Sequence, residues 1–200
     1  MTRIRRHLVT SALVLLFVLF AWANLTATLR TGSPTGVGLT IIAAWTAVLF
    51  LFRRDPLAVS GRPVAWVAAS VGTFADLLAR PIDATGGTHV AGELLQIVGV
   101  ALAIVSLGAL GRSFGLVAAN RGIQIRGAYR LVRHPVYTSY LIGWAGYVLE
   151  SPALRNVVVF AVAVAAQLVR IREEEAVLGC DERYRRYMNV VRARLVPFVY

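Results

Sequence analysis

Two clusters of polar and ionisable side chains lie beside long apolar stretches in the second half of the chain. The first, residues 127–137, places Tyr129, His134 and Tyr137 at the start of an apolar stretch. Ionisable groups close to hydrocarbon are energetically costly and are therefore usually functional. The cluster predicts a polar binding site at the mouth of a membrane helix.

The second cluster runs from Arg170 to Glu175 and follows the last apolar stretch. If that stretch and this run form one helix, Arg170 and Glu174 lie one turn apart on one face. Each cluster also has a purely structural interpretation. Arg and Tyr beside a span are common interface anchors, and His134 can be a solvated cap. Arg170 with Glu174 can be a surface pair worth about 0.2–0.5 kcal/mol.

The elements that position these clusters are expected to be membrane helices. Hydrophobic residues make up 58% of the 200 residues, and the mean hydropathy is +0.67, whereas a soluble domain is roughly 45–50% apolar. A transmembrane helix needs roughly 20 apolar residues. Six runs approach this length: 8–29, 36–52, 64–79, 90–110, 135–149 and 153–169. The third run is short, so five spans remain the alternative.

We therefore expect an all-α integral membrane helical bundle with a cytosolic helical tail. Residues 1–110 are expected to form the N-terminal transmembrane helices. Residues 111–200 are expected to form one unit of binding loop, last transmembrane hairpin and tail, with the tail helical to about Met188. The apolar stretch of a signal peptide spans about 7–15 residues, so the longer first run is interpreted as a retained helix.

The charges indicate how the helices are oriented. The net charge is +11, and all 21 basic residues are arginine. With six spans, 18 arginines fall on one side of the membrane and 3 on the other, which predicts that both termini are cytoplasmic. Because the arginines lie between apolar runs, topology explains them better than nucleic acid does. One cysteine allows no internal disulfide, and no phosphate-binding loop or metal-spaced Cys/His set is present.

The motifs together resemble one enzyme family. R-H-P-x-Y at 133–137 precedes a helical hairpin, which is followed by R-x-x-x-E-E at 170–175, Tyr184-x-x-Tyr187 and R-L-V-P at 194–197. This combination is similar to the superfamily of isoprenylcysteine carboxyl methyltransferases and phospholipid methyltransferases, which are integral membrane enzymes. The resemblance covers about residues 111–197 and is that of a bacterial member.

The resemblance implies that S-adenosylmethionine binds at the cytosolic membrane surface and leaves as S-adenosylhomocysteine. It implies methyl transfer to a lipophilic acceptor that carries a carboxylate, an amine or a thiol. Arg170 would face this acceptor. No residue is assigned as a general base. Position in the family's motifs implies these cofactor contacts: Arg121, Gly122, Ile123, Gln124, Tyr129, His134, Pro135, Tyr137 and Glu174.

The chain departs from the family pattern in its tail. Gly179-Cys180-Asp181 replaces a longer turn, and Phe198 stands where bacterial relatives often have glycine. Two other functions fit the scaffold: a non-catalytic membrane or accessory protein, and a reductase that uses a nicotinamide cofactor, as in the related sterol reductases. The cofactor that the protein binds distinguishes the three functions.

Overall fold

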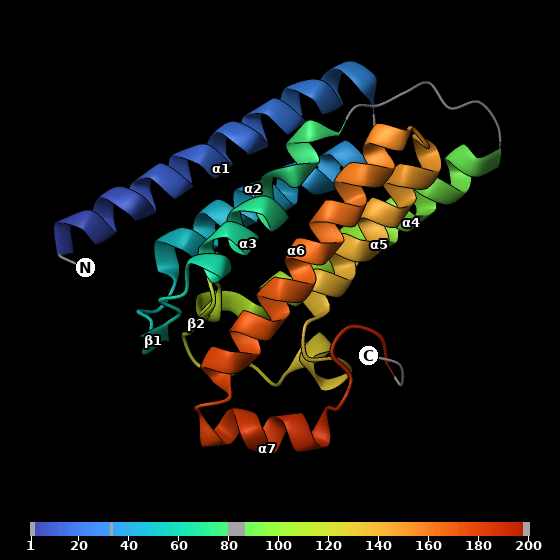
Figure 1. Cartoon of the computed structure of the whole chain (residues 1–200). Helices are drawn as coiled ribbons and strands as arrows, with labels where there is room; N and C mark the ends of the chain where they lie inside the picture. The colour runs from blue at the N-terminus through green and yellow to red at the C-terminus, as the bar shows by residue number, and fades with distance from the viewer. Residues whose placement is uncertain (1–2, 33, 80–86, 198–200) are drawn as a thin grey trace.

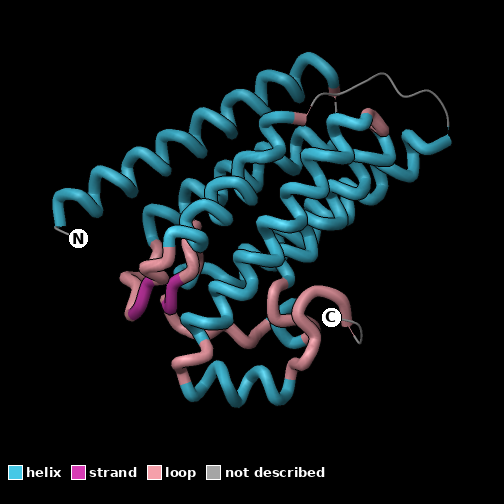
Figure 2. The backbone as a smooth tube through the Cα atoms, in the orientation of Figure 1, coloured by secondary structure: helices cyan, strands magenta, loops and turns pink. Residues whose placement is uncertain are grey.

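The computed structural model describes residues 3–32, 34–79 and 87–197 and is mostly helical (Figure 1, Figure 2). Its α-helices are α1 (Arg3–Thr31), α2 (Pro34–Phe52), α3 (Pro63–Phe74), α4 (Gly87–Leu110), α5 (Pro135–Glu150), α6 (Leu154–Leu178) and α7 (Glu182–Val190). The 3-10 helices are η1 (Ala75–Leu78), η2 (Gly111–Ser113) and η3 (Gly127–Arg130). Strands β1 (Ala58–Val59) and β2 (Ala119–Asn120) pair antiparallel. Helices α1 to α6 form a bundle, and α7 lies across one end of it (Figure 1).

Four helices, α1, α2, α4 and α6, are long and apolar enough to cross a membrane. Helix α3 has 12 residues and α5 has 16, which is shorter than the roughly 17–25 residues of most spans. The expected multi-pass helical membrane protein is therefore confirmed with four candidate spans. Six full-length spans are not shown.

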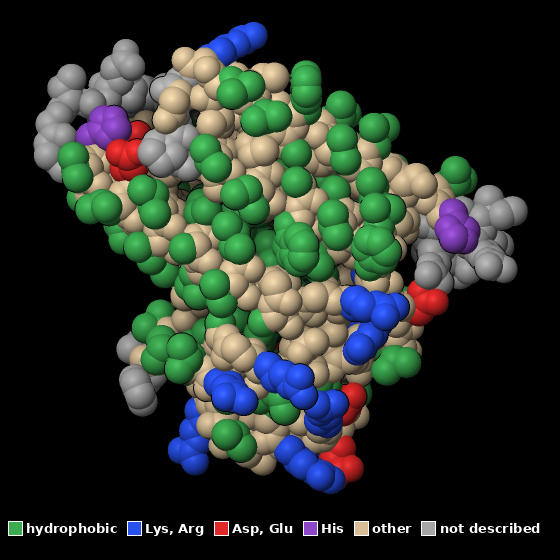
Figure 3. Space-filling view, turned by 180° about the vertical axis from the view of Figure 1, so that it is seen from behind, with side chains coloured by type: hydrophobic (Ala, Val, Ile, Leu, Met, Phe, Trp, Pro, Cys, Tyr) green, Lys and Arg blue, Asp and Glu red, His purple; other side chains and the backbone are tan. Residues whose placement is uncertain are grey.

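Apolar side chains cover the outside of the bundle. On α1, Leu8, Leu15, Trp22 and Leu29 follow one another at seven-residue spacing, and each is 60–77% exposed. In Figure 3 hydrophobic side chains spread over the bundle, while most visible arginines gather toward one end. Contiguous exposed apolar surface is rare on soluble monomers. The distribution fits a bundle that is surrounded by lipid.

Helices α4 and α5 approach closely because glycines face each other. A Cβ added to Gly99 would lie 2.7 Å from the backbone nitrogen of Gly143, and one added to Gly92 would lie 2.7 Å from the carbonyl oxygen of Gly146. In lipid, small residues at an interface let backbones pack by van der Waals contact. This packing fixes the position of α5, and therefore of the His134 segment directly before it.

Helix α6 continues without a break from its apolar part to Leu178. Arg170 and Glu174 consequently lie one turn apart on one helix, as the sequence predicts. The helical tail pauses at the turn of residues 179–181 and resumes as α7, which ends at Val190, close to the predicted end near Met188.

Asp181 begins α7 as its N-cap. Its carboxylate accepts hydrogen bonds from the Asn120 side-chain amide (3.1 Å) and the Arg183 backbone N–H (2.9 Å). These bonds lower the pKa of Asp181 below its usual value. The turn that departs from the family pattern is thus tied to β2. Phe198 lies outside the described residues.

The arginine-rich segments meet at one end of the bundle. In the loop after α2, the Arg54 backbone N–H donates to the Arg112 carbonyl (2.8 Å), which lies between α4 and α5. Arg62, in the same loop, pairs with Glu173 near the end of α6 (2.8 Å). Segments far apart in the sequence therefore build one polar surface below the apolar bundle.

Candidate functional site

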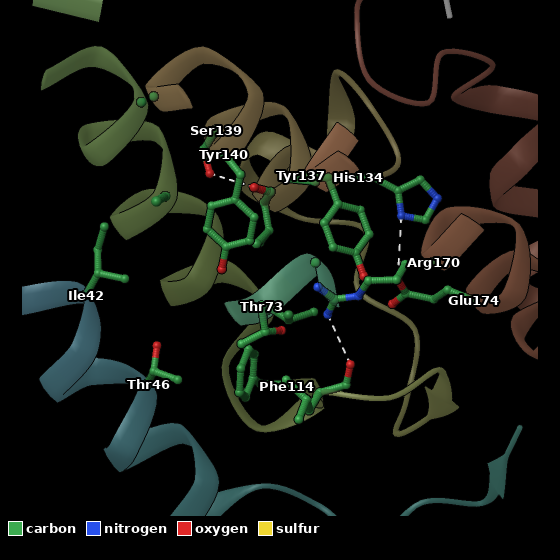
Figure 4. Close-up of a pocket in the computed structure, with 18 of the residues that line it drawn as sticks. Ile42, Thr46, Thr73, Phe114, His134, Tyr137, Ser139, Tyr140, Arg170 and Glu174 are labelled. Carbon is green, nitrogen blue, oxygen red and sulfur yellow. Dashed lines mark hydrogen bonds and ion pairs between the residues drawn. The ribbon is translucent and has the colours of Figure 1, made fainter. Parts of the chain in front are cut away.

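A cavity of about 460 Å³ extends from the arginine-rich end into the bundle, between α2, α4, α5 and α6. The 111–134 segment, the start of α5 and the end of α6 all contribute to its polar part (Figure 4). Eight of the ten predicted site residues line it: Gly122, Ile123, Gln124, Tyr129, His134, Tyr137, Arg170 and Glu174. The structure therefore brings most of the predicted site together.

Glu174 is held by two aromatic side chains that come from the opposite flank of the last hairpin. The Tyr137 hydroxyl donates to Glu174 Oε2 (2.8 Å), and His134 Nδ1 lies 3.8 Å from the same oxygen. The His134 and Tyr137 rings stack with centroids 5.6 Å apart. These side chains point toward one another in Figure 4. His134 is buried, which rules out the interpretation of this residue as a solvated cap.

Arg170 lies beside this group and is buried. Its guanidinium donates to Gln167 Oε1 (3.1 Å) and to the Leu116 carbonyl (3.0 Å), and its Cζ lies 5.1 Å from the centre of the Tyr137 ring. No carboxylate in the described part of the chain forms an ion pair with it. The interpretation of Arg170 with Glu174 as a solvated surface pair therefore does not hold.

Glu175 joins three basic side chains, a role that the sequence analysis did not identify. Arg133 Nε donates to Glu175 Oε1 (2.8 Å), and Arg194 Nε donates to Glu175 Oε2 (2.9 Å). His134 Nε2 lies 3.2 Å from Oε1, so each nitrogen of this imidazole faces a carboxylate. Glu175 thereby fixes the ring that faces the cavity and connects it to the C-terminal tail.

Residues 191–197, here called the tail strap, pack against the start of α5. The backbone N–H groups of Arg133 and His134 donate to the carbonyls of Ala193 and Arg194 (both 2.9 Å). The Thr138 hydroxyl donates to the Leu195 carbonyl (2.7 Å). The strap therefore supports the segment that carries His134.

Arg121 and Pro135 are the two predicted site residues that do not line the cavity. Arg121 turns toward the loop after α2, where its Nη1 donates to the Arg54 carbonyl (2.7 Å). Pro135 is fully buried at the first turn of α5, a position that suits proline because a backbone N–H there would have no partner within the helix.

Gly122 adopts φ +100°, a left-handed conformation that glycine tolerates, and it turns residues 122–124 to the cavity.

Three tyrosines form the wall near α7. The Tyr187 hydroxyl donates to the Tyr129 carbonyl (2.6 Å) and lies 3.4 Å from the Val132 carbonyl. Tyr184 also lines the cavity, but its buried hydroxyl has no hydrogen-bond partner within the described residues. Burial raises the pKa of Tyr129, Tyr184 and Tyr187 well above the usual value, so all three stay neutral at physiological pH.

The inner part of the cavity is mainly apolar, although Thr46, Gln96 and Asn156 also line it. Ile42 of α2, Trp144 of α5 and Phe160 of α6 line it, and the Trp144 and Phe160 rings pack edge to face at 6.3 Å. The cavity thus joins a charged end near Glu174 to a hydrocarbon-like interior within one space. An amphiphilic molecule matches this distribution of polar and apolar surface.

Comparison with known proteins gives one family match. Residues 88–184 match the family model described as phospholipid methyltransferase. All ten predicted site residues fall inside the matched region, which begins in α4 and ends in α7. A comparison with curated proteins found no match.

Proposed function

We propose that the chain methylates a lipophilic acceptor at the cytosolic membrane surface, because residues 88–184 match the phospholipid methyltransferase family, whose members are membrane enzymes that use S-adenosylmethionine. The superfamily expected from the sequence is confirmed, and a methyltransferase is favoured over a reductase or a non-catalytic scaffold. The observation that carries the proposal is the continuous cavity, polar beside Glu174 and apolar beside Trp144.

The polar part of the cavity fits the groups of S-adenosylmethionine. Its volume falls within the range of about 300–1,000 Å³ typical of small-molecule sites. The Glu174 carboxylate can accept hydrogen bonds from an ammonium group or ribose hydroxyls, and His134 can bind a carboxylate. The face of Tyr137 can hold a sulfonium, with about 0.5–2 kcal/mol for each cation–π contact. We propose that the eight cavity-lining residues predicted from the sequence act here, and that Arg121 supports them from behind.

When bound, the cofactor supplies a methyl group to the acceptor's lone pair, while the bond from methyl carbon to sulfur breaks and its electron pair stays on sulfur. The protein's main contribution is alignment, since positioning two reactants can supply roughly 7–11 kcal/mol. Arg170 lines the cavity beside the Tyr137 ring, where it can pair with an anionic acceptor. A carboxylate acceptor needs no base, whereas an amine or thiol releases a proton that Glu174 or His134 can take.

The proposed topology has both termini in the cytoplasm. The arginine-rich loops gather at the end of the bundle that holds the polar part of the cavity, and the positive-inside rule assigns such an end to the cytosol. We propose that α3 and α5 complete six spans, with α5 held in the bilayer by its glycine contacts to α4. The acceptor would then enter from the bilayer and the cofactor from the cytosol.

The proposal is tested by mass spectrometry of a lipid extract incubated with the purified chain and methyl-labelled S-adenosylmethionine. We expect labelled lipid from the wild type and a large loss with Glu174→Gln. The matched control is Glu182→Gln, which removes an exposed carboxylate that pairs with Arg186 one turn later on α7. The proposal fails if the wild type labels no lipid, or if Glu174→Gln and Glu182→Gln label equally.

A further inference from the structure

The two tyrosines that α7 buries are in different hydrogen-bonding states. Tyr184 and Tyr187 are 3% and 7% exposed, and their rings lie 5.7 Å apart. The Tyr187 hydroxyl donates to the Tyr129 carbonyl. Within residues 3–32, 34–79 and 87–197, the Tyr184 hydroxyl has no partner although it is shut off from solvent. Most buried polar atoms are hydrogen-bonded, so such an exception requires an explanation.

The surroundings of Tyr184 indicate what would satisfy its hydroxyl. Tyr184 and Tyr187 belong to one buried cluster against which Ile123 and Leu178 pack, and Tyr184 lines the cavity together with Glu174. Aromatic and aliphatic side chains thus form one wall of the cavity, which the Glu174 carboxylate also lines. A purine ring can lie against such a wall, while the ribose next to it presents hydroxyls to a carboxylate. Tyr184 is neutral, so its O–H can donate to a ring nitrogen or a ribose oxygen.

We propose that the Tyr184 hydroxyl is a binding group for the nucleoside part of the cofactor. This inference rests on the proposed function, because it requires that S-adenosylmethionine occupies the cavity. The hydroxyl contributes nothing to folding, since no protein atom in the described structure bonds to it. Its role is to bind ligand, whereas Tyr187 holds the η3 segment in place.

Calorimetry on the purified full chain in detergent tests this role with two probes. S-adenosylhomocysteine carries the nucleoside and the amino-acid part, whereas methylthioadenosine carries the nucleoside alone. We expect Tyr184→Phe to weaken the binding of both probes about tenfold, the value of one hydrogen bond of about 1.4 kcal/mol. Equal binding by wild type and variant overturns the inference, as does a loss for S-adenosylhomocysteine alone. If the wild type binds neither probe, the proposed function falls as well.

Thermal unfolding without ligand provides a second readout, with Tyr187→Phe as the matched control. Tyr184→Phe removes a buried hydroxyl that lacks a partner, so its melting temperature should equal or exceed that of the wild type. Tyr187→Phe removes a bonded hydroxyl and should melt lower. If Tyr184→Phe melts as low as Tyr187→Phe, the hydroxyl serves folding and the inference is wrong.

Discussion

Replacement of Glu175 by glutamine should loosen the tail strap while the helices of the membrane bundle stay folded. The carboxylate accepts hydrogen bonds from Arg133 (2.8 Å) and Arg194 (2.9 Å), and it lies 3.2 Å from His134. Glutamine keeps the shape of the side chain but removes its charge. The substitution therefore leaves three basic groups around a neutral amide, and only Arg194 belongs to the strap.

The magnitude follows from these contacts. A hydrogen bond to a charged group contributes about 1.5–3 kcal/mol, and breaking a buried ion pair costs roughly 3–5 kcal/mol in total. The share that holds the strap, through Arg194, is about 1.5 kcal/mol. That value corresponds to roughly a tenfold higher population of strap-open molecules. The remaining free energy comes from the contacts of Glu175 with Arg133 and His134, and its loss should lower the melting temperature.

Hydrogen–deuterium exchange measures the effect directly. The Arg133 and His134 amides donate to strap carbonyls, so their exchange in Glu175→Gln should be about tenfold faster than in the wild type. Glu182→Gln is the control, because its exposed pair with Arg186 should contribute almost nothing. If the Arg133 and His134 amides exchange at the same rate in Glu175→Gln as in the wild type, Glu175 does not hold the strap.

Three further predictions follow from the described contacts. Gly99→Ala should destabilise the bundle by about 1–3 kcal/mol, because its Cβ meets the Gly143 backbone. Gly108→Ala, where the space is open, should keep or raise the melting temperature, because alanine favours a helix over glycine. Arg170→Gln should reduce labelled lipid about tenfold with little change in S-adenosylhomocysteine binding, and exposed Arg172→Gln should affect neither. The α6–α7 turn should become protease-sensitive below about pH 4 in the wild type. Its Asp181 cap has a lowered pKa, so the cap's contribution is complete above the unfolded pKa and is lost as pH falls through the folded value; Asp181→Asn should remove this dependence on pH.

Much of the site was predictable because it depends on local spacing and on motifs. Arg170 and Glu174 share one face because α6 is continuous, which the helical period determines. The proximity of His134 and Glu174 was implied by the family's motifs on either side of the hairpin, and the distance of 3.8 Å from His134 Nδ1 to Glu174 Oε2 agrees with that expectation. The apolar runs likewise predicted where α1, α2, α4 and α6 lie.

Other features depend on contacts between distant residues and left no signal in the sequence. Glu173, Glu174 and Glu175 form one acidic run, yet they face Arg62, Tyr137 and Arg133 respectively. Which carboxylate faces which partner depends on the rotation of α6 against the loop after α2 and the start of α5. The short turn at residues 179–181 was expected, but its contact to β2 was not, because it depends on the Asn120 amide that donates to Asp181, 61 residues away.

The central claim is that His134 and Glu174, from opposite flanks of the last hairpin, bind one nucleoside cofactor together. Calorimetric titration of S-adenosylhomocysteine into the purified wild type and into the His134→Ala/Glu174→Ala double variant tests it most directly. We expect saturable binding to the wild type and none to the double variant. Absence of binding to the wild type, or equal affinity in both proteins, would contradict it.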